Sequence, residues 1–495
     1  MKDDLEAKPS TGRLFLSVFP SIMLPMFLAV VDQTIVSTAL PAIAASLGGV
    51  ERVSWVVVAY LLAGTIAAPV YGQLRDVYGG KRMMFAALGI FIAASLLCAV
   101  STSIEMLSLA RILQGLGGGG LMTLSQALIG EAIPPRERAR YQGYLASVMV
   151  ASSTFGPVVG GLLTHHFGWR SIFLINVPLG LLAVLLTVRL ERRPGRPQQA
   201  WSFDGMGLVL FIAFIAPVLL ALQQAQRMSA SALPGFLVLT GIGIAALLGL
   251  IVRERRAPHP LLPIHLLRQP TIWRSDALAA CHGATLVSLV TFLPIYLRVL
   301  RGTSPSETGL LLLPLMLGIG AGSMATGRIV SRTGRTTIFP SVGLIFVTAA
   351  LVLLGLFAGD LGTRQLSLYL AFVGLFMGTV MGVVQVTVQN AAGSASLGSA
   401  AASVQLSRSI GAAAGTALVG TVLFAALALA NPDTAPLFAT LVQQGPDALA
   451  AVPAPRRAMA LTEIASAFRA AFLTMAAFAA AGLWLAWTIP SRRLS

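Results

Sequence analysis

The sequence predicts an all-α membrane protein with fourteen transmembrane helices, from its composition, its long apolar runs and one repeated polar signature. Of the 495 residues, 56% are hydrophobic and only 11% are charged. A soluble protein carries about 25% charged residues, so this chain is too apolar for water. Its mean hydropathy is +0.82. The lipid bilayer is therefore the expected solvent and the first expected partner of the chain.

Long apolar runs place the helices. A run of about 18 or more apolar residues is long enough to span a membrane as a helix. Fourteen runs reach that length, near residues 14–38, 53–74, 83–103, 105–129, 142–164, 170–190, 204–224, 232–252, 274–298, 308–329, 337–358, 366–389, 400–428 and 464–489. The first run is longer than the apolar region of a typical signal peptide, so we expect it to remain as the first helix.

Basic residues predict the orientation. The net charge is +16, from 34 basic and 18 acidic residues, which on a soluble protein would suggest nucleic-acid binding. With the N-terminus inside, 22 Lys and Arg fall in cytoplasmic segments and 8 in external ones. That is the positive-inside pattern of membrane proteins. We therefore expect topology signals and headgroup contacts, no nucleic acid, and both termini in the cytoplasm.

The remaining composition narrows the class further. Cys98 and Cys281 both fall inside predicted helices and form neither a disulfide framework nor a metal site. Arginine greatly outnumbers lysine, and alanine and glycine are abundant, as in proteins of GC-rich bacterial genomes. The expected location is the bacterial cytoplasmic (inner) membrane.

A polar signature occurs twice. GQLRDVYGGKR at 72–82 and the weaker GRIVSRTGR at 327–335 both place two glycines seven apart and both precede an apolar run. Each is expected to be a short loop between two helices. One signature in each half of a membrane protein suggests a transporter built from two related bundles.

The spacing of the two copies predicts the domains. Eight apolar runs separate them, whereas two six-helix repeats would have only six in between. The sequence therefore predicts an N-terminal six-helix bundle at 1–190, a linker with two inserted helices at 191–256, and a C-terminal six-helix bundle at 257–495. The external segment near 430–461 contains five prolines and is expected to lack regular structure.

Six motifs stand in a fixed order along the chain. They are LAVVDQTIVSTALPAIAASLG at 28–48, WVVVAYLLA at 55–63, the polar signature at 72–82, RILQG at 111–115, GPVVGG at 156–161 and WRSIFLINVPLG at 169–180. With them the chain resembles the major facilitator superfamily over nearly its whole length. Within it, the chain is most similar to the fourteen-helix drug:proton antiporters of the QacA/EmrB type.

This resemblance implies a major facilitator fold of two six-helix bundles plus two inserted central helices. It also implies a proton-coupled multidrug efflux antiporter, not an enzyme, that exports lipophilic or cationic drugs or other amphipathic compounds by alternating access. The proton gradient would drive it without a cofactor, and a periplasmic adaptor with an outer-membrane channel is a candidate partner. Two alternatives stay open: export of an endogenous metabolite, siderophore or lipid, and a non-transporting scaffold or sensor.

Asp32, Arg111 and Gln114 are the candidate proton-coupling residues. Asp32 and Arg111 lie at comparable depths in the first and fourth predicted helices, and Gln114 shares a face with Arg111. A carboxylate inside a membrane must be paired, hydrated or protonated, and an arginine there needs a partner. Asp32 is the nearest candidate partner by depth. A purely structural aspartate, and an arginine that snorkels outward, are the alternatives.

The resemblance assigns a gating role to five residues of the first polar signature: Gly72, Asp76, Gly79, Lys81 and Arg82. Two positions depart from the family pattern, because Val77 and Gly80 stand where basic residues are usual. In the second copy Ser331 replaces the aspartate. The predicted gate is therefore reduced.

The resemblance also marks an antiporter motif at Gly156, Pro157, Gly160 and Gly161, where small residues permit close helix packing. GLGGGG at 115–120 formally matches a nucleotide-binding glycine pattern. It lies inside a predicted membrane helix with no strand before it, so we expect packing there too.

A candidate substrate cavity is predicted from aromatic, polar and charged residues, since aromatic faces attract lipophilic cations and polar groups inside membranes line cavities. Its candidate residues are Trp55, Tyr60, Met149, Phe155, Asp276, Gln385, Gln389 and Arg408. Packing and lipid contact remain the alternative for each. His282 is expected to make a satisfied polar contact.

Overall fold

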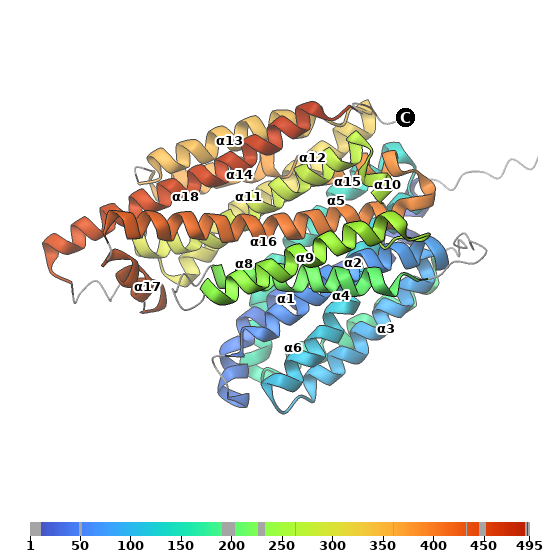
Figure 1. Ribbon diagram of the computed structural model, residues 1–495, viewed down its shortest axis with the longest axis horizontal. Helices are drawn as coiled ribbons and strands as arrows, with labels where there is room; N and C mark the ends of the chain where they lie inside the picture. The colour runs from blue at the N-terminus through green and yellow to red at the C-terminus, as the bar shows by residue number, and fades with distance from the viewer. Residues whose placement is uncertain are drawn as a thin grey trace, which may run out of the picture. The chain divides into compact units, whose positions relative to one another are not determined.

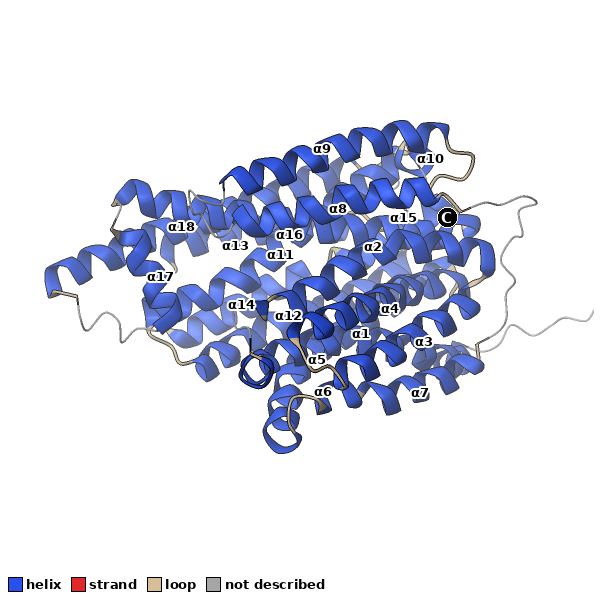
Figure 2. Ribbon diagram, turned by 60° about the horizontal axis from the view of Figure 1, so that its bottom comes forward, coloured by secondary structure: helices blue, strands red, loops and turns tan. Residues whose placement is uncertain are grey.

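The computed structural model describes residues 11–48, 52–190, 203–225, 233–262, 264–359, 361–431, 433–444, 452–490 and 493. Over these residues the chain is helical, and the only β-type pairing is an isolated bridge between Arg335 and Arg493 (Figure 1). Figure 2 shows the same helices with the described loops between them. The predicted all-α fold is confirmed. A helix suits this sequence because it satisfies its own backbone hydrogen bonds where a membrane offers no water.

Contacts divide the chain into two compact units. Unit 1 comprises Met1–Pro134, Ala151–Trp201 and Ser394–Ala402, and unit 2 comprises Pro135–Val150, Ser202–Gly393 and Ser403–Ser495. Two helices, α5 (Pro135–Phe167) and α16 (Leu397–Ala430), contribute residues to both. The division expected from the sequence, 1–190, 191–256 and 257–495, stays a prediction.

Unit 1 is built around one central helix. This central helix is α4 (Ile104–Ala132), and the others are α1 (Thr11–Leu47), α2 (Trp55–Tyr78), α3 (Gly80–Ala99), α6 (Ser171–Leu174) and α7 (Asn176–Val188), with the short 3-10 turn η3 (Ser394–Ser396). Helix α4 contacts α1, α2 and α3. A Cβ on Gly117 would lie 2.8 Å from the backbone nitrogen of Phe91, so the glycines of GLGGGG allow α3 to approach closely. The packing interpretation of that run is confirmed.

Unit 2 contains α8 (Gly205–Ala225), α9 (Leu233–Arg256), α10 (Ile264–Leu267), α11 (Pro270–Arg301), α12 (Pro305–Thr333), α13 (Ile338–Phe357), α14 (Thr363–Met377), α15 (Met381–Ala392), α17 (Thr434–Gln444) and α18 (Ala454–Thr488). Helix α18 packs against α11 and α13, α12 packs against α14, and α8 packs against α9. Prolines begin α5, α11 and α12, where the missing N–H costs nothing.

Thirteen helical spans in the described part of the chain are long and apolar enough to cross a membrane. The fourteenth predicted span is α4, which has 29 residues but is not among the thirteen. Its glycines and the polar Arg111, Gln114 and Gln126 lower the mean hydropathy of this helix. Since most of α4 is buried among its neighbours, packing and not lipid contact determines its composition.

Two segments differ from the sequence-based expectation. The predicted run at 366–389 is interrupted at residues 378–380, between α14 and α15. The expectation of an irregular segment at 430–461 was wrong for most of its described residues, because α17 occupies Thr434–Gln444 and α18 begins at Ala454. Residues 432 and 445–451 of this segment lie outside the described residues. Phe438 of α17 is buried against Phe424 and Phe468, which explains why this stretch forms a helix.

Candidate functional site

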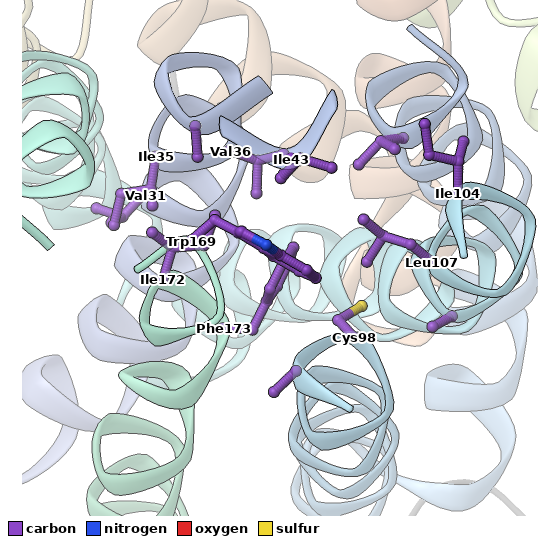
Figure 3. Close-up of a cluster of buried hydrophobic side chains, with 14 residues drawn as sticks. Val31, Ile35, Val36, Ile43, Cys98, Ile104, Leu107, Trp169, Ile172 and Phe173 are labelled. Atoms are coloured by element: carbon purple, nitrogen blue, oxygen red, sulfur yellow. The ribbon is translucent and has the colours of Figure 1, made fainter. Parts of the chain in front are cut away.

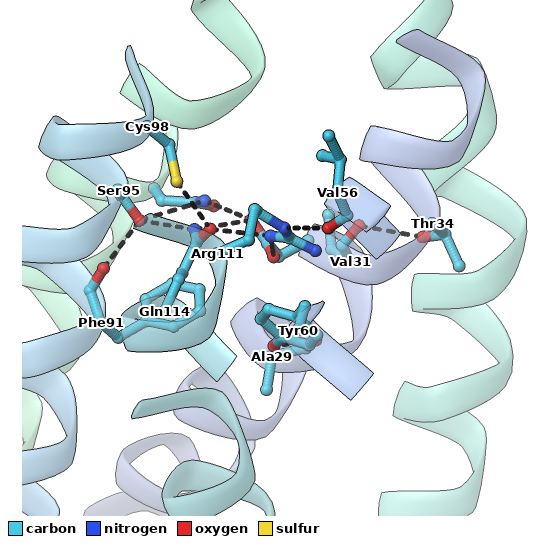
Figure 4. Close-up of polar contacts among 12 residues, drawn as sticks. Ala29, Val31, Thr34, Val56, Tyr60, Phe91, Ser95, Cys98, Arg111 and Gln114 are labelled. Carbon is cyan, nitrogen blue, oxygen red and sulfur yellow. Dashed lines mark hydrogen bonds and ion pairs between the residues drawn. The ribbon is translucent and has the colours of Figure 1, made fainter. Parts of the chain in front are cut away.

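Asp32 and Arg111 form an ion pair in the interior of unit 1. Arg111 Nη1 donates to Asp32 Oδ2, and each residue is only 1% exposed. Figure 4 shows the contacts around Arg111. Asp32 and Arg111 were predicted to be partners because they lie at comparable depths, and the structure brings them together. Ion pairs this deeply buried are stable only when further hydrogen bonds satisfy both groups.

Two amides complete the surroundings of the carboxylate. Gln114 Nε2 donates to Asp32 Oδ1 at 2.9 Å, and Asn176 Nδ2 donates to the same oxygen at 2.8 Å. Gln114 also donates to Ser95 Oγ at 2.8 Å, and that hydroxyl donates to the carbonyl of Phe91. Side chains from α4 and α7 therefore meet at the Asp32 carboxylate of α1, and Ser95 of α3 is linked to it through Gln114.

The guanidinium of Arg111 has other partners as well. Its Nε donates to the carbonyl of Val56 at 3.0 Å, and its Nη1 donates to Gln114 Oε1 at 2.7 Å. The guanidinium carbon lies 4.1 Å from the centre of the Tyr60 ring, within range of a cation–π contact. Tyr60 is fixed in turn by a 3.1 Å hydrogen bond from its hydroxyl to the carbonyl of Ala29. Arg111 therefore keeps neutral partners even if Asp32 loses its charge.

Apolar side chains pack next to this polar cluster. Trp169, Phe173, Leu107 and Cys98 belong to one buried hydrophobic group with residues of α1, as Figure 3 shows. Cys98 contributes to both environments, because its thiol also approaches Gln114 Oε1 at 3.3 Å. This apolar packing helps to keep the ion pair away from solvent, and a dry ion pair interacts more strongly than a hydrated one.

The end of α5 packs against α1, the helix that carries Asp32. A Cβ on Gly156 would lie 2.7 Å from Thr34 Cβ, and one on Gly160 would lie 2.8 Å from the carbonyl oxygen of Ile35. Gly161 has open space around its Cβ position, and Pro157 is exposed. Only half of the predicted antiporter motif therefore takes part in this contact.

The first polar signature is helical over most of its length, so the expectation of a loop was wrong. Residues 72–78 complete α2, Gly79 alone makes the turn with φ 90°, and α3 begins at Gly80. The helix continues because its polar groups are paired. Arg75 bonds Asp76 at 2.8 Å and Glu131 of α4 at 2.5 Å.

Asp76 also caps the start of α16. Its carboxylate accepts hydrogen bonds from the backbone N–H groups of Gly398 and Ser399, at 2.9 and 3.0 Å, and from the Ser399 hydroxyl at 2.9 Å. A negative charge at a helix N-terminus is stabilised by the free N–H groups and the helix dipole. Gly72 permits this approach, because a Cβ there would lie 2.7 Å from the Gly398 carbonyl oxygen.

The two basic residues of the signature lie elsewhere. Lys81 Nζ donates to the carbonyls of Val188 and Leu190 at the end of α7, and Arg82 is exposed. In the second copy, Gly334 makes the turn with φ 68°, and Gly327 lies close to the backbone of Ala139. The hydroxyl of Ser331 donates to the carbonyl of Arg328 in its own helix, so this copy lacks the capping carboxylate.

A model of the Major Facilitator Superfamily matches residues 22–416. The chain belongs to the major facilitator superfamily. This is a family of transporters and not of enzymes, and the predicted family is confirmed. Together with the apolar spans, membership shows that the chain is a multi-pass membrane protein.

Several curated relatives are similar to this major facilitator protein. An uncharacterized MFS-type transporter of Mycobacterium tuberculosis is 32% identical over 407 residues, covering 81% of this chain but only 58% of that protein. The chain therefore spans less than two thirds of that relative's length. The multidrug transporter MdtP of Bacillus subtilis is 29% identical, covering 86% and 77% of the two chains. The efflux pump dotC of Dothistroma septosporum is 30% identical, covering 97% and 84%.

Solved structures support the fold. The human organic anion transporter MFSD10 aligns with a TM-score of 0.64 at 15% identity, covering 95% of this chain and 99% of that one. The proton:xylose symporter XylE aligns with a TM-score of 0.63 at 13% identity, covering 98% of both. At such low identity the likeness shows the fold alone. The predicted major facilitator fold is confirmed.

The residues proposed for a substrate cavity in this major facilitator protein lie in different surroundings. Tyr60 belongs to the polar cluster of Arg111, and its place in a substrate cavity stays a prediction. Trp55 and Phe155 are 45% and 57% exposed on unit 1, and Met149 is partly exposed on unit 2. Exposed aromatic and apolar side chains at such positions also suit lipid contact.

The polar cavity candidates belong to unit 2. Gln385 and Gln389 are buried on α15, and Arg408 donates from Nε to Gln405 Oε1 at 3.4 Å within α16. Asp276 is buried on α11, where Ser403 donates to it. His282 Nε2 lies 3.2 Å from the carbonyl of Met377, so the expected polar contact is present. Among the described residues, no group of three or more metal-ligating side chains gathers in either unit.

Proposed function

We propose that this chain is a proton-coupled efflux antiporter that exports lipophilic or cationic drugs or other amphipathic compounds by alternating access. The observation that carries the proposal is the buried Asp32–Arg111 pair in unit 1. An ionisable pair inside a membrane bundle is costly, and such pairs mark proton relays and substrate pathways. Relatives named as a multidrug transporter and an efflux pump support the choice of substrate class.

The contacts suggest how a proton would act on the pair. Protonation of Asp32 Oδ2 removes the charge that holds Arg111 Nη1. Arg111 then still has the Val56 carbonyl, the Gln114 amide oxygen and the Tyr60 ring. Gln114 and Asn176 still bond Asp32 Oδ1, the oxygen that stays a carbonyl acceptor in the neutral acid. Both protonation states therefore have partners, which a residue that binds and releases protons requires.

A cationic substrate would compete with the proton for the same negative charge. Since an ionised Asp32 attracts cations and a neutral one does not, substrate and proton would favour opposite states of the cluster. Coupling of this kind needs each ligand to stabilise one state more than the other. Rocking of the two bundles would then present the site to the two sides of the membrane in turn.

Asp76 is proposed to take part in the gate. Its bonds to the first residues of α16 join a helix near the start of the chain to one near its end. The Asp76 carboxylate satisfies the first backbone N–H groups of α16. If the carboxylate moved away from this helix end, the carboxylate and the N–H groups would each lose their hydrogen-bond partners. Such a contact stabilises one conformation of the transport cycle over another.

The proposed setting is the bacterial inner membrane, with both termini in the cytoplasm. The positive-inside distribution of Lys and Arg supports this orientation. The proton gradient would supply the driving force without a cofactor, and a periplasmic adaptor with an outer-membrane channel remains a candidate partner. Export of an endogenous metabolite, siderophore or lipid is the second candidate. It is favoured by relatives in fungal biosynthetic clusters, such as the acurin A cluster transporter.

The test is transport by purified protein in proteoliposomes. With an imposed pH gradient, wild-type protein should concentrate a lipophilic cation against its gradient, and Asp32→Asn should not. The variant must insert and unfold at a temperature near that of the wild type. Equal gradient-driven transport by both proteins would remove Asp32 from the mechanism. Transport of a metabolite or lipid, but of no lipophilic cation, would select the second candidate.

A further inference from the structure

Asp276 is a buried acid that the proposed mechanism does not use. It lies on α11, seven residues into the helix, and is 4% exposed. Its Oδ1 accepts one long hydrogen bond, 3.4 Å from the hydroxyl of Ser403 on α16. Its Oδ2 is buried and has no hydrogen-bond partner among the residues that the structure describes.

No cation in the described part of the chain pairs with this acid. Arg274 is two residues away, so the two side chains point to different sides of the helix. The guanidinium of Arg274 donates instead to the carbonyl of Thr488 at the end of α18. Arg408 donates to Gln405, and its backbone lies against Gly283, almost two turns farther along α11.

The other elements that pack against α11 bring no described counter-charge to Asp276. On α18 the last charged residue is Arg469, far from the end at Thr488, and α17 carries none. Helix α15 presents amides, and the arginines of α12 near its end are exposed. Helix α10 contains His265, whose side chain lies outside the described residues. On α11 itself, His282 contacts the Met377 carbonyl.

Other buried aspartates of this chain show the contrast. Asp204, also in unit 2, is 5% exposed, receives 3.0 and 3.1 Å bonds from Arg253, and accepts the backbone N–H of Gly207. Asp32 has Arg111 and two amides. Each of these two buried aspartates has an arginine and further donors. Asp276 has neither.

A buried carboxylate without a counter-charge is strongly disfavoured and takes up a proton instead. A neutral carboxyl needs far less: one donor to its carbonyl oxygen, which the Ser403 hydroxyl provides. We propose that Asp276 binds a proton in this conformation and forms a second proton-binding site, in unit 2 and separate from the Asp32 pair. In this site Oδ2 carries the proton and Oδ1 accepts from Ser403.

A role for this site in transport rests on the proton coupling proposed above. Proton binding by Asp276 itself does not. If both hold, the exchanger carries protons on two acids. A direct measurement of the carboxyl group separates the two questions.

The experiment is infrared difference spectroscopy of the full-length protein in lipid nanodiscs during a pH titration. A neutral carboxyl absorbs at a frequency where carboxylates do not. Wild type and Asp32→Asn should share a carboxyl band that disappears at alkaline pH, and Asp276→Asn should lack it. Ser403→Ala should keep the band but move it to higher frequency, because its carbonyl loses a hydrogen bond.

The result that overturns the proposal is a wild-type spectrum with no band that depends on Asp276. The Ser403→Ala spectrum supplies a second test if Asp276→Asn fails to fold: a band at unchanged frequency would also contradict the site. A band that vanishes at constant pH on addition of sodium would assign Asp276 to metal-ion binding instead. If the band is present but no substrate moves protons, the proton site stands and the antiporter proposal falls.

Discussion

Arg111 remains buried because three kinds of partner surround its guanidinium. A carboxylate, a backbone carbonyl and the face of Tyr60 each satisfy a different part of the group. Breaking a buried ion pair by removing one partner costs about 3–5 kcal/mol, since it leaves an uncompensated charge. The neutral partners of Arg111 lower that cost when Asp32 is protonated. In the proposed mechanism, these partners let the pair open without unfolding the bundle.

Arg111→Lys tests the geometry of the pair. Lysine keeps the charge but cannot donate to Asp32 and Val56 from one planar fork. Loss of a hydrogen bond between charged groups costs about 1.5–3 kcal/mol, so we expect gradient-driven transport to fall about tenfold or more. Initial rates in proteoliposomes measure this. Wild-type rates in the lysine variant would mean that charge alone suffices.

Asn176→Ala tests the amide that holds Asp32. The variant leaves Asp32 Oδ1 with Gln114 as its amide partner, and we expect a loss of about 1.5–3 kcal/mol of stability from one hydrogen bond to a charged group. Thermal unfolding of single and double variants with Asp32→Asn forms a double-mutant cycle. Its interaction energy should be about 0.5–3 kcal/mol. Strictly additive effects would show that Asn176 does not act through Asp32.

Sequence reasoning found only part of this cluster. Asp32 and Arg111 were predictable because ionisable residues are rare inside spans, and Gln114 because it lies one turn from Arg111. Asn176 and Ser95 were missed as members. Neutral polar residues are common in membrane helices, and which of them faces Asp32 depends on helix rotation. The one available signal was the position of Asn176 within WRSIFLINVPLG.

At the scale of elements, close packing of α5 on α1 connects the antiporter motif to Asp32. Gly156 and Gly160 face Thr34 and Ile35, which follow Asp32 on α1. Thr34 also donates a 3.4 Å hydrogen bond to the carbonyl of Ser152 on α5. A change in the spacing of these two helices would therefore move the helix that carries the acid.

Gly160→Val and Gly161→Val form a matched pair. Both add the same side chain at consecutive positions of one helix, but only at Gly160 does the Cβ meet the α1 backbone. Overpacking costs about 1–3 kcal/mol, so Gly160→Val should lower the unfolding temperature and impair transport. Gly161→Val should stay near wild type. Equal behaviour of the two variants in unfolding and transport assays would contradict this role of the contact.

Helix ends were harder to predict than helices. The polar stretch at 72–78 looked like a loop, yet it is helical because Arg75 forms ion pairs with both Asp76 and Glu131. The α17 segment looked irregular because of its prolines, but Phe438 and Leu441 anchor it. In each case the segment is helical because of contacts with residues far away in the sequence. The sequence pattern of the segment itself does not reveal those contacts.

At the scale of the whole molecule, composition determined the class. A chain with 11% charged residues must place most of its surface in lipid. The lengths of its apolar runs then predicted the membrane-spanning helices. Only α4 fell short of a typical span, because its surface faces other helices. The order of motifs predicted the superfamily, which the family match confirms. Substrate and coupling depend on a few buried groups and stay proposals.

The central claim is that Asp32 exchanges a proton for substrate. It is tested most directly by the protons that purified protein releases into weakly buffered solution when a lipophilic cation is added. Wild-type protein should release protons in proportion to the substrate bound, and Asp32→Asn should bind substrate more weakly and release markedly fewer. Release that is the same in both proteins, or none from the wild type with any substrate, would contradict the account.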